Sequence, residues 1–353
     1  MQHRYFAASN SAEGFKNYYP QVFDRVDRLF VIKGGPGTGK SSLMKKYASL
    51  AEGRGDVVEY YYCSSDPSSL DGVLIIGKDE CFGIVDGTSP HTVEPTVPGA
   101  RENIIDLGQF WDQSLLFKQK NEIMALSSKK SSAYRRAYSY LRSCGNLSAV
   151  TDSLLRKALD RTKLCQAVGR ELRSLSLPQG ECRILPALQG AVGMTGRVRF
   201  DSFERNAKTC VKVGELYGVG RMYLDRLAEA LRKCDVTVRI SYDPIDPLHI
   251  DGLFIEERET AYVIESAKSP YRDSEAEGEE GGRHINTKRF VDSGILKEVR
   301  GELRYAQRLY DDCENGALHA LREAGVYHFL LEDIYKNAMD FKRMNNSPLG
   351  NDK

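Results

Sequence analysis

Residues 34–41 read Gly34-Gly35-Pro36-Gly37-Thr38-Gly39-Lys40-Ser41. This stretch matches G-x-x-x-x-G-K-[ST], the pattern of a phosphate-binding loop. The apolar residues 29–32 precede it and predict a buried strand, and residues 42–50 follow it with helical character. Glycines allow backbone conformations in which successive N–H groups point into one concavity, and the helix N-terminus adds a positive field there. The stretch therefore predicts a strand–loop–helix unit that binds the phosphates of a nucleoside triphosphate.

Each position of this loop has an expected role in a complex with ATP and Mg²⁺, the two expected cofactors. Lys40 is predicted to reach the β- and γ-phosphates, and the Ser41 hydroxyl to coordinate Mg²⁺. Asp86 follows the apolar residues 81–85, a Walker B pattern in which the carboxylate holds Mg²⁺ through water. The alternative for Asp86 is a turn residue at the end of a strand. The residues predicted to contact the nucleotide are Gly34, Gly35, Pro36, Gly37, Thr38, Gly39, Lys40, Ser41 and Ser42.

The position after the Walker B aspartate is Gly87, where many ATPases have a glutamate that polarises the attacking water. Another group must therefore orient the nucleophile, or hydrolysis is slow. Candidates lie in the loops 63–72 and 88–94, and they are Asp66, Asp71, His91 and Glu94. Asp66 and Asp71 recur in the second half of the chain, which favours a folding role for them as turn or cap residues. His91 joins the lysine and aspartate above as a catalytic candidate, although a plain loop histidine is the favoured interpretation.

An internal repeat organises the chain, with an offset of about 180 residues. Residues 66–75 read Asp-Pro-Ser-Ser-Leu-Asp-Gly-Val-Leu-Ile, and residues 246–255 read Asp-Pro-Leu-His-Ile-Asp-Gly-Leu-Phe-Ile. The match continues on both sides and predicts two copies of one unit, spanning 1–180 and 181–353. Strands alternate with helices in each copy. The predicted fold is therefore α/β, with two tandem P-loop NTPase-like three-layer α/β/α domains that have mostly parallel sheets and helical additions.

The second copy has lost the chemistry of the glycine loop. Arg221 replaces the lysine, Met222 replaces the metal-binding serine, and Glu215 puts an anion where phosphate is expected. These changes disfavour binding of a Mg-nucleotide by charge and by coordination. The second half is therefore predicted to be a structural or regulatory partner of the first. An alternative role is the supply of Arg221 to a neighbouring active site.

The rest of each copy is predicted to be largely helical. Residues 113–176 form a long helical segment that is either a lid over phosphates or, as favoured here, a solvated face. Tyr134, Tyr138 and Leu141 recur at helical spacing and are expected in a core. Residues 272–283 are acidic and predict a mobile loop that blocks the second glycine loop or binds a basic partner. The basic residues of the long segment are Lys129, Lys130, Arg135, Arg136 and Arg142.

The composition indicates a globular protein without a strong nucleic-acid signal. Lys and Arg total 50 against 49 Asp and Glu, so the net charge of +1 gives no general attraction to nucleic acid or anionic membrane. No apolar run approaches a membrane span, and residues 1–6 lack the apolar core of a signal peptide. The eight cysteines include no C-x-x-C pair, which disfavours zinc, and several of them lie in apolar stretches and are expected to be small core residues rather than parts of disulfides. A cytoplasmic location is predicted.

Several stretches resemble an uncharacterised family of bacterial tandem P-loop ATPases, found mainly in spore-forming Gram-positive lineages. The likeness extends over nearly the whole chain, and it is clearer in the first half. The resemblance implies ATP binding and hydrolysis, without indicating a substrate. Both halves in that family usually carry a P-loop, and this sequence departs at Glu215, Arg221 and Met222. The stretches that carry the resemblance are 4–8, 33–41, 63–67 and 85–91.

Three functions fit these observations. The favoured one is an ATPase that uses Mg-ATP in its first half to change the relation between the halves, in work on an unknown protein partner. The second is a phosphotransferase, in which residues 113–176 form a lid and a site for an unknown small acceptor. The third is a nucleotide sensor without turnover, which the glycine at position 87 also permits.

Overall fold

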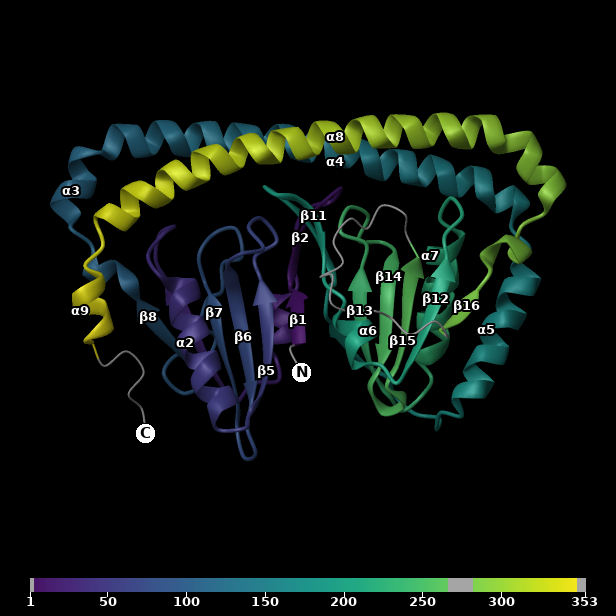
Figure 1. The fold of residues 1–353 in the computed structure, drawn as a ribbon, viewed down its shortest axis with the longest axis horizontal. Coiled ribbons are helices and arrows are strands. Elements are labelled where there is room, and N and C mark those ends of the chain that lie inside the picture. Colours follow the sequence, from purple (N-terminus) through teal and green to yellow (C-terminus); the bar gives the residue numbers. More distant parts are fainter. Residues whose placement is uncertain (1–2, 266–281, 348–353) are drawn as a thin grey trace.

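The computed structural model describes residues 3–265 and 282–347, which form an α/β fold with two six-stranded sheets. The sheets stand side by side beneath two long helices that run across the whole molecule (Figure 1). Within the described ranges, none of the helices carries an apolar stretch that could cross a lipid bilayer. The acidic segment 272–283 lies almost wholly outside these ranges.

The first sheet has the strand order β1-β5-β6-β7-β4-β8, and β6 runs antiparallel to its neighbours while the other pairs are parallel. β6 occupies part of the segment predicted to be a loop. It forms because the turn-like pair Asp71-Gly72 leads into an apolar run that is buried within the sheet. The strands are β1 (His3–Phe6), β4 (Arg28–Lys33), β5 (Val57–Tyr62), β6 (Leu70–Ile76), β7 (Cys81–Asp86) and β8 (Glu102–Asp106).

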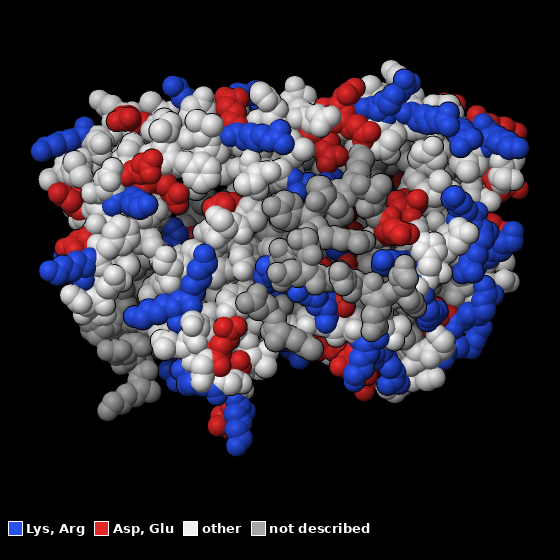
Figure 2. All heavy atoms as spheres, viewed as in Figure 1, with Lys and Arg blue, Asp and Glu red and all other residues white. Residues whose placement is uncertain are grey.

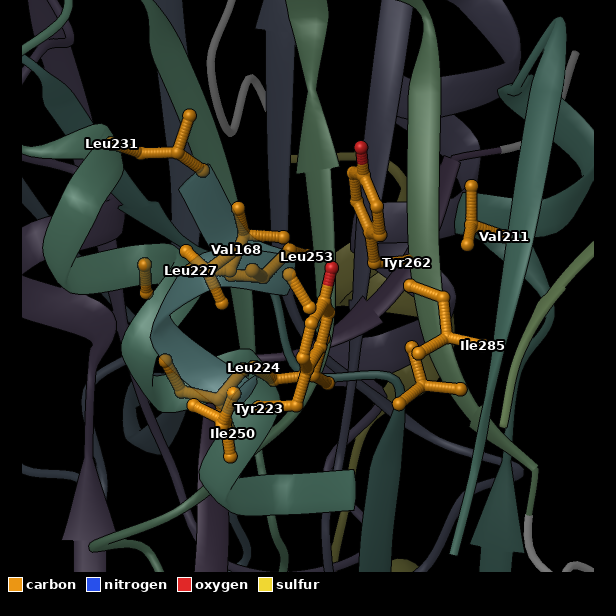
Figure 3. Close-up of a cluster of buried hydrophobic side chains, with 14 of the residues drawn as sticks. Val168, Val211, Tyr223, Leu224, Leu227, Leu231, Ile250, Leu253, Tyr262 and Ile285 are labelled. Carbon is orange, nitrogen blue, oxygen red and sulfur yellow. The ribbon is translucent and has the colours of Figure 1, made fainter. Parts of the chain in front are cut away.

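The second sheet repeats this order as β9-β13-β14-β15-β12-β16, again with one antiparallel strand, β14. Apolar side chains of the sheet meet those of several helices in one core, which includes Val168, Leu227 and Leu253 (Figure 3). The strands are β9 (Arg183–Pro186), β12 (Thr209–Gly214), β13 (Thr237–Tyr242), β14 (Ile250–Ile255), β15 (Thr260–Glu265) and β16 (Arg283–Ile285).

Shorter elements complete both repeats in the same sequence order. α2 (Lys40–Gly53) packs on one face of the first sheet, and α1 (Tyr19–Val22) lies on the other face. α7 (Val219–Leu231) is the counterpart of α2 in the second repeat. The remaining elements are the hairpins β2 (Ala8–Ser11) with β3 (Gly14–Asn17) and β10 (Gly190–Gly193) with β11 (Gly196–Arg199), the helices α3 (Gln113–Lys118) and α6 (Ser202–Asn206), and the 3₁₀ helices η1 (Leu107–Phe110), η2 (Glu256–Arg258) and η3 (Thr287–Phe290).

Two long helices connect the sheets, and each carries the helical end of its own repeat to the sheet of the other repeat. α4 (Lys120–Ala158) begins beside the first sheet and ends at the second, whereas α8 (Ser293–Asn337) runs the opposite way (Figure 1). α5 (Arg161–Leu175) follows α4 and packs into the core of the second sheet. α9 (Phe341–Asn345) follows α8 and packs into the core of the first. The helical end of each sequence repeat therefore completes the core of the other repeat.

Matching backbone contacts anchor the two exchanged ends. The N–H of Asp112 donates to the carbonyl of Ala338 at 2.7 Å. The N–H of Asp292, the counterpart of Asp112 in the repeat, donates to the carbonyl of Ala158 at 2.8 Å. The side chain of each aspartate also caps the helix that follows it, by accepting two backbone N–H groups. The two repeats thus resemble each other also in the backbone contacts that join the helical end of one repeat to the other repeat.

A buried ion pair joins the two sheets. Glu59 of β5 is 1% exposed and accepts from Arg239 Nη2 of β13 at 2.7 Å. Glu59 also accepts from Arg25 at 3.1 Å and from the Tyr61 hydroxyl at 2.6 Å. Glu59 and Arg239 are counterparts in the repeat, since 239 − 59 = 180. A pseudo-twofold axis that relates the repeats therefore passes close to this ion pair.

The surface carries charges of both signs. Figure 2 shows basic and acidic side chains interspersed over one face of the described residues, which agrees with their nearly equal numbers in the sequence. All eight cysteines are free, and Cys144 and Cys234 are buried. The prediction that cysteines act as small core residues is therefore confirmed for these two.

Candidate functional site

The glycine loop connects β4 to α2 at the carboxyl edge of the first sheet, and β4 lies between β7 and β8. Gly37 and Gly39 have φ of +69° and +86°, which are conformations that favour glycine. Gly34 has no room for a side chain, because a Cβ there would lie 2.8 Å from Thr38 Oγ1. The strand, loop and helix predicted from the sequence are therefore present, and α2 begins at Lys40.

Lys40 and Asp86 come together because β4 and β7 are parallel neighbours. Lys40 Nζ donates to two carbonyls of the glycine loop at 3.1 and 2.6 Å, and it lies 3.5 Å from Asp86 Oδ2. Ser41 Oγ accepts from the N–H of Leu70 at 2.9 Å. The three residues expected to bind phosphate and metal thus share one end of the sheet.

Asp86 is buried, and its neighbours hold the carboxylate in one orientation. Oδ1 accepts from the N–H of Thr88 at 2.9 Å and from the Thr88 hydroxyl, while Oδ2 faces Lys40. Burial raises the pKa of Asp86, and Lys40 and His91 oppose this effect. One carboxylate oxygen therefore faces the glycine loop, as the predicted metal role requires.

His91 belongs to the loop between β7 and β8, but its side chain is buried inside this site. The ring is 5% exposed, with Nδ1 3.0 Å from the carbonyl oxygen of Asp86 and Nε2 3.0 Å from Asp71 Oδ2. Burial alone would lower the pKa of His91, but Asp71 and Asp86 raise it to about 9. The ring is therefore a cation near neutral pH, which suits stabilisation of negative charge rather than removal of a proton from water.

The other loop candidates have different positions. Asp66 accepts from a backbone N–H two residues later at 3.2 Å, as expected of a turn residue. Glu94 is 70% exposed and pairs with Lys33 at 2.7 Å, away from the cluster. Asp71 differs from the prediction, because it lies in β6 and its buried carboxylate faces His91. Since β6 is antiparallel, its first residues share an edge with the carboxyl ends of the parallel strands.

The exchanged helices close the site, although no sequence motif marks them for this role. A cavity of about 920 Å³ lies over the glycine loop, between it and both long helices. A Cβ on Gly37 would lie 2.6 Å from the carbonyl oxygen of Glu332, so α8 packs directly on the loop. Two basic residues of α4, Lys130 and Arg135, line this cavity; Lys130 is half-buried, whereas Arg135 remains exposed, as predicted for a solvated face. The helix residues in its wall are Lys130, Ser131, Tyr134, Arg135 and Tyr138 from α4, and His328, Glu332, Asp333 and Lys336 from α8.

The second glycine loop keeps its shape but contains its own anion. Gly218, with φ of +103°, precedes α7, and its N–H donates to the Glu215 carboxylate. A phosphate in the first loop would accept from the same type of group. Arg221 Nη1 lies 3.9 Å from Asp243 Oδ2, and Met222 packs against the core. The cavity beside this loop is about 400 Å³, less than half the size of the first.

The repeat holds one signal for the closure by exchanged helices. Glu332 and Asp152 are counterparts 180 residues apart, and each lies against the glycine loop of the opposite repeat. A Cβ on Gly218 would lie 3.4 Å from Asp152 Oδ1, just as one on Gly37 would meet Glu332. The contact at Gly37 is made by the backbone carbonyl of Glu332 and the one at Gly218 by the side chain of Asp152, so the two positions correspond although the contacting atoms differ.

Comparison of the chain with protein-family models, with curated proteins and with solved structures found no match in any of the three. The resemblance to tandem P-loop ATPases therefore stays a prediction from the quoted stretches. The chemistry of the site follows from its own residues and their geometry.

Proposed function

We propose that the chain is an ATPase that binds Mg-ATP at residues 34–42 and hydrolyses it slowly, with its second half as a structural or regulatory partner. The observation that carries the proposal is the convergence of Lys40, Ser41 and Asp86 at one edge of a mostly parallel sheet. This set supplies a cation for the phosphates and oxygen ligands for Mg²⁺. The two repeats are then tandem P-loop NTPase-like domains with unequal loops.

The roles of the residues follow from their positions. Lys40 would exchange its contacts with loop carbonyls for contacts with the β- and γ-phosphates. Backbone N–H groups of the loop and the N-terminus of α2 would stabilise the remaining charge. Ser41 would coordinate Mg²⁺ directly, and Asp86 would hold it through water. The second loop lacks this lysine and this serine. The N–H of Gly218 in that loop already donates to the Glu215 carboxylate, so it is not available to a phosphate.

Slow turnover is expected from the groups around Asp86. Gly87 supplies no carboxylate for the attacking water, and His91 is a cation near neutral pH. A cation in this position stabilises negative charge but does not accept a proton. Lys130 and Arg135 of α4 add positive charge to the wall of the cavity. A bound nucleotide would therefore contact α4 as well as the glycine loop, and binding would be coupled to the position of the exchanged helices and of the second repeat.

Calorimetric titration with Mg-ATP tests the binding step. Lys40→Ala is expected to abolish measurable binding because it removes the cation at the phosphates. Arg221→Ala, the matched change in the second loop, is expected to leave the affinity nearly unchanged. Thermal unfolding of both variants controls for folding. Full binding by Lys40→Ala, or an equal loss in the two variants, would contradict the proposal.

Phosphate release then separates hydrolysis from the two alternatives. Slow release from Mg-ATP alone, reduced in Lys40→Ala, is the expected result. ADP formation only in the presence of an added acceptor would instead indicate a phosphotransferase, for which the 920 Å³ cavity has room beside the loop. Tight binding without release would indicate a sensor.

A further inference from the structure

Asp71, Asp86 and His91 form a compact buried group at the carboxyl edge of the first sheet. One ligand atom from each residue lies within 4.8 Å of the other two. We propose that this group binds one divalent transition-metal ion, additional to the Mg²⁺ that accompanies ATP. The site itself needs no nucleotide, whereas its contribution to hydrolysis rests on the proposed function.

The spacing of two of these atoms fits ligands of a single ion. His91 Nε2 and Asp71 Oδ2 are 3.0 Å apart, and the charge of Asp71 raises the pKa of His91, yet Asp71 Oδ2 has no hydrogen bond of good geometry among the described residues. The two atoms are therefore close but do not point along a hydrogen-bond direction. Ligands at ~2.1 Å from an octahedral ion are ~3.0 Å apart along an edge of the octahedron. The pair is thus spaced to share a cation.

His91 has the orientation of a metal-binding histidine. Its Nδ1 lies 3.0 Å from the carbonyl oxygen of Asp86, to which it donates, and this contact turns Nε2 toward Asp71. Metal-binding histidines commonly donate their second ring N–H to a carbonyl or carboxylate, which fixes the tautomer and the ring plane. An edge contact with Tyr19, at 5.5 Å between ring centroids, holds the ring further. When a metal ion displaces the Nε2 proton, the lone pair left on Nε2 is therefore directed at the group.

A second buried polar atom at this site also lacks a partner. The Tyr19 hydroxyl is buried and makes no hydrogen bond within the described residues. It lies near enough to Asp71 and Asp86 that both carboxylates, together with burial, raise its pKa. Unsatisfied buried groups are costly, and two of them face one cluster. A metal ion with a coordinated water would give the carboxylate a ligand role, and the phenol oxygen would accept a hydrogen bond from that water.

The donor set indicates the class of ion. Carboxylates suit Mg²⁺ and Mn²⁺, whereas imidazole suits Zn²⁺, Fe²⁺ and similar ions, so the mixed set favours Mn²⁺, Fe²⁺ or Zn²⁺ over Mg²⁺. The ion would replace the positive charge that His91 now places between the two carboxylates. It would also lower the pKa of a bound water, so hydrolysis is expected to be faster with this ion bound than in the ion-free state for which slow turnover is proposed above.

Electron paramagnetic resonance of Mn²⁺ added to the full chain without nucleotide tests the site. The wild-type protein is expected to bind one Mn²⁺ and to show spin-echo modulation from a histidine nitrogen. His91→Gln and Asp71→Asn are each expected to lower the Mn²⁺ affinity at least about tenfold. Glu94→Gln is the matched control, because Glu94 lies in the same loop but is exposed and paired with Lys33.

Three results would overturn the proposal: no Mn²⁺ binding by the wild type, unchanged affinity in both variants, or bound Mn²⁺ without a nitrogen ligand. The nitrogen signature is read on the wild type, so it does not depend on the folding of any variant. Mn²⁺ that binds only with ATP and is lost in Ser41→Ala is the nucleotide's own ion and would also refute the site. Mg-ATP binding is measured separately through Lys40→Ala, so failure of the ATPase proposal is distinguishable from failure of the metal site.

Discussion

Acid is expected to destabilise the protein through Glu59, at the contact between the two sheets. Burial alone would raise the pKa of Glu59, but Arg239, Arg25 and Tyr61 lower it from 4.5 to about 2. Because the folded-state pKa is below the unfolded-state value, the stabilisation is present above pH 4.5 and is lost as the pH falls toward 2. The shift corresponds to about 3 kcal/mol, of which about 2 kcal/mol is lost by pH 3.

Urea unfolding at about pH 6 and about pH 3 measures this loss. The free energy of unfolding of the wild type is expected to fall by about 2 kcal/mol more than that of Glu59→Gln, since the other carboxylates titrate equally in both proteins. Glu80→Gln, which removes an exposed partner of Arg28, is the control and is expected to behave as the wild type. An equal loss in the wild type and Glu59→Gln would refute the reasoning.

Three further changes test the contacts between the repeats. Gly37→Ala would put a Cβ on a residue with a φ of +69°, only 2.6 Å from the carbonyl oxygen of Glu332. The free energy of unfolding in urea is expected to fall by at least ~1–2 kcal/mol, and amide exchange at the end of α8 is expected to become faster. Gly193→Ala would put a Cβ 2.3 Å from the carbonyl of Ser64, and a fall in melting temperature is expected; an unchanged value would contradict the close approach. Burial would lower the pKa of His249, but two aspartates raise it to about 10, so its stabilisation is complete below pH 6.5 and declines as the pH rises toward 10. His249→Asn should abolish that alkaline decline, which thermal unfolding across this range would detect.

Local chemistry explains why the glycine loop could be predicted. Gly37 and Gly39 take φ values that few other residues tolerate, so the sequence pattern and the conformation are linked within a few residues. Asp86 was found because an apolar strand that ends in a carboxylate is equally local. The α/β class and the mostly parallel sheets follow from alternating strands and helices, and the structure agrees with both.

Long-range pairing explains what could not be predicted. The spacing of Leu164 and Val168 indicates a helix with one apolar face, but it does not say which sheet receives that face. Asp71 recurs in the second repeat and was therefore expected to be a turn or cap residue, yet pairing of β6 with β5 and β7 made it part of a strand. The contact of Glu332 with Gly37 joins residues almost 300 positions apart, for which no motif exists.

The crossed helices also impose an order on biosynthesis. The glycine loop leaves the ribosome early, but Met339 and Met344, which complete its hydrophobic core, are synthesised about 300 residues later. Until then, one apolar face of the nascent first sheet is covered by α2 but lacks the side chains from α9 and the residues before it, so part of that face stays open to chaperones that recognise such surfaces. The cavity over the glycine loop can therefore be completed only after both halves have been made.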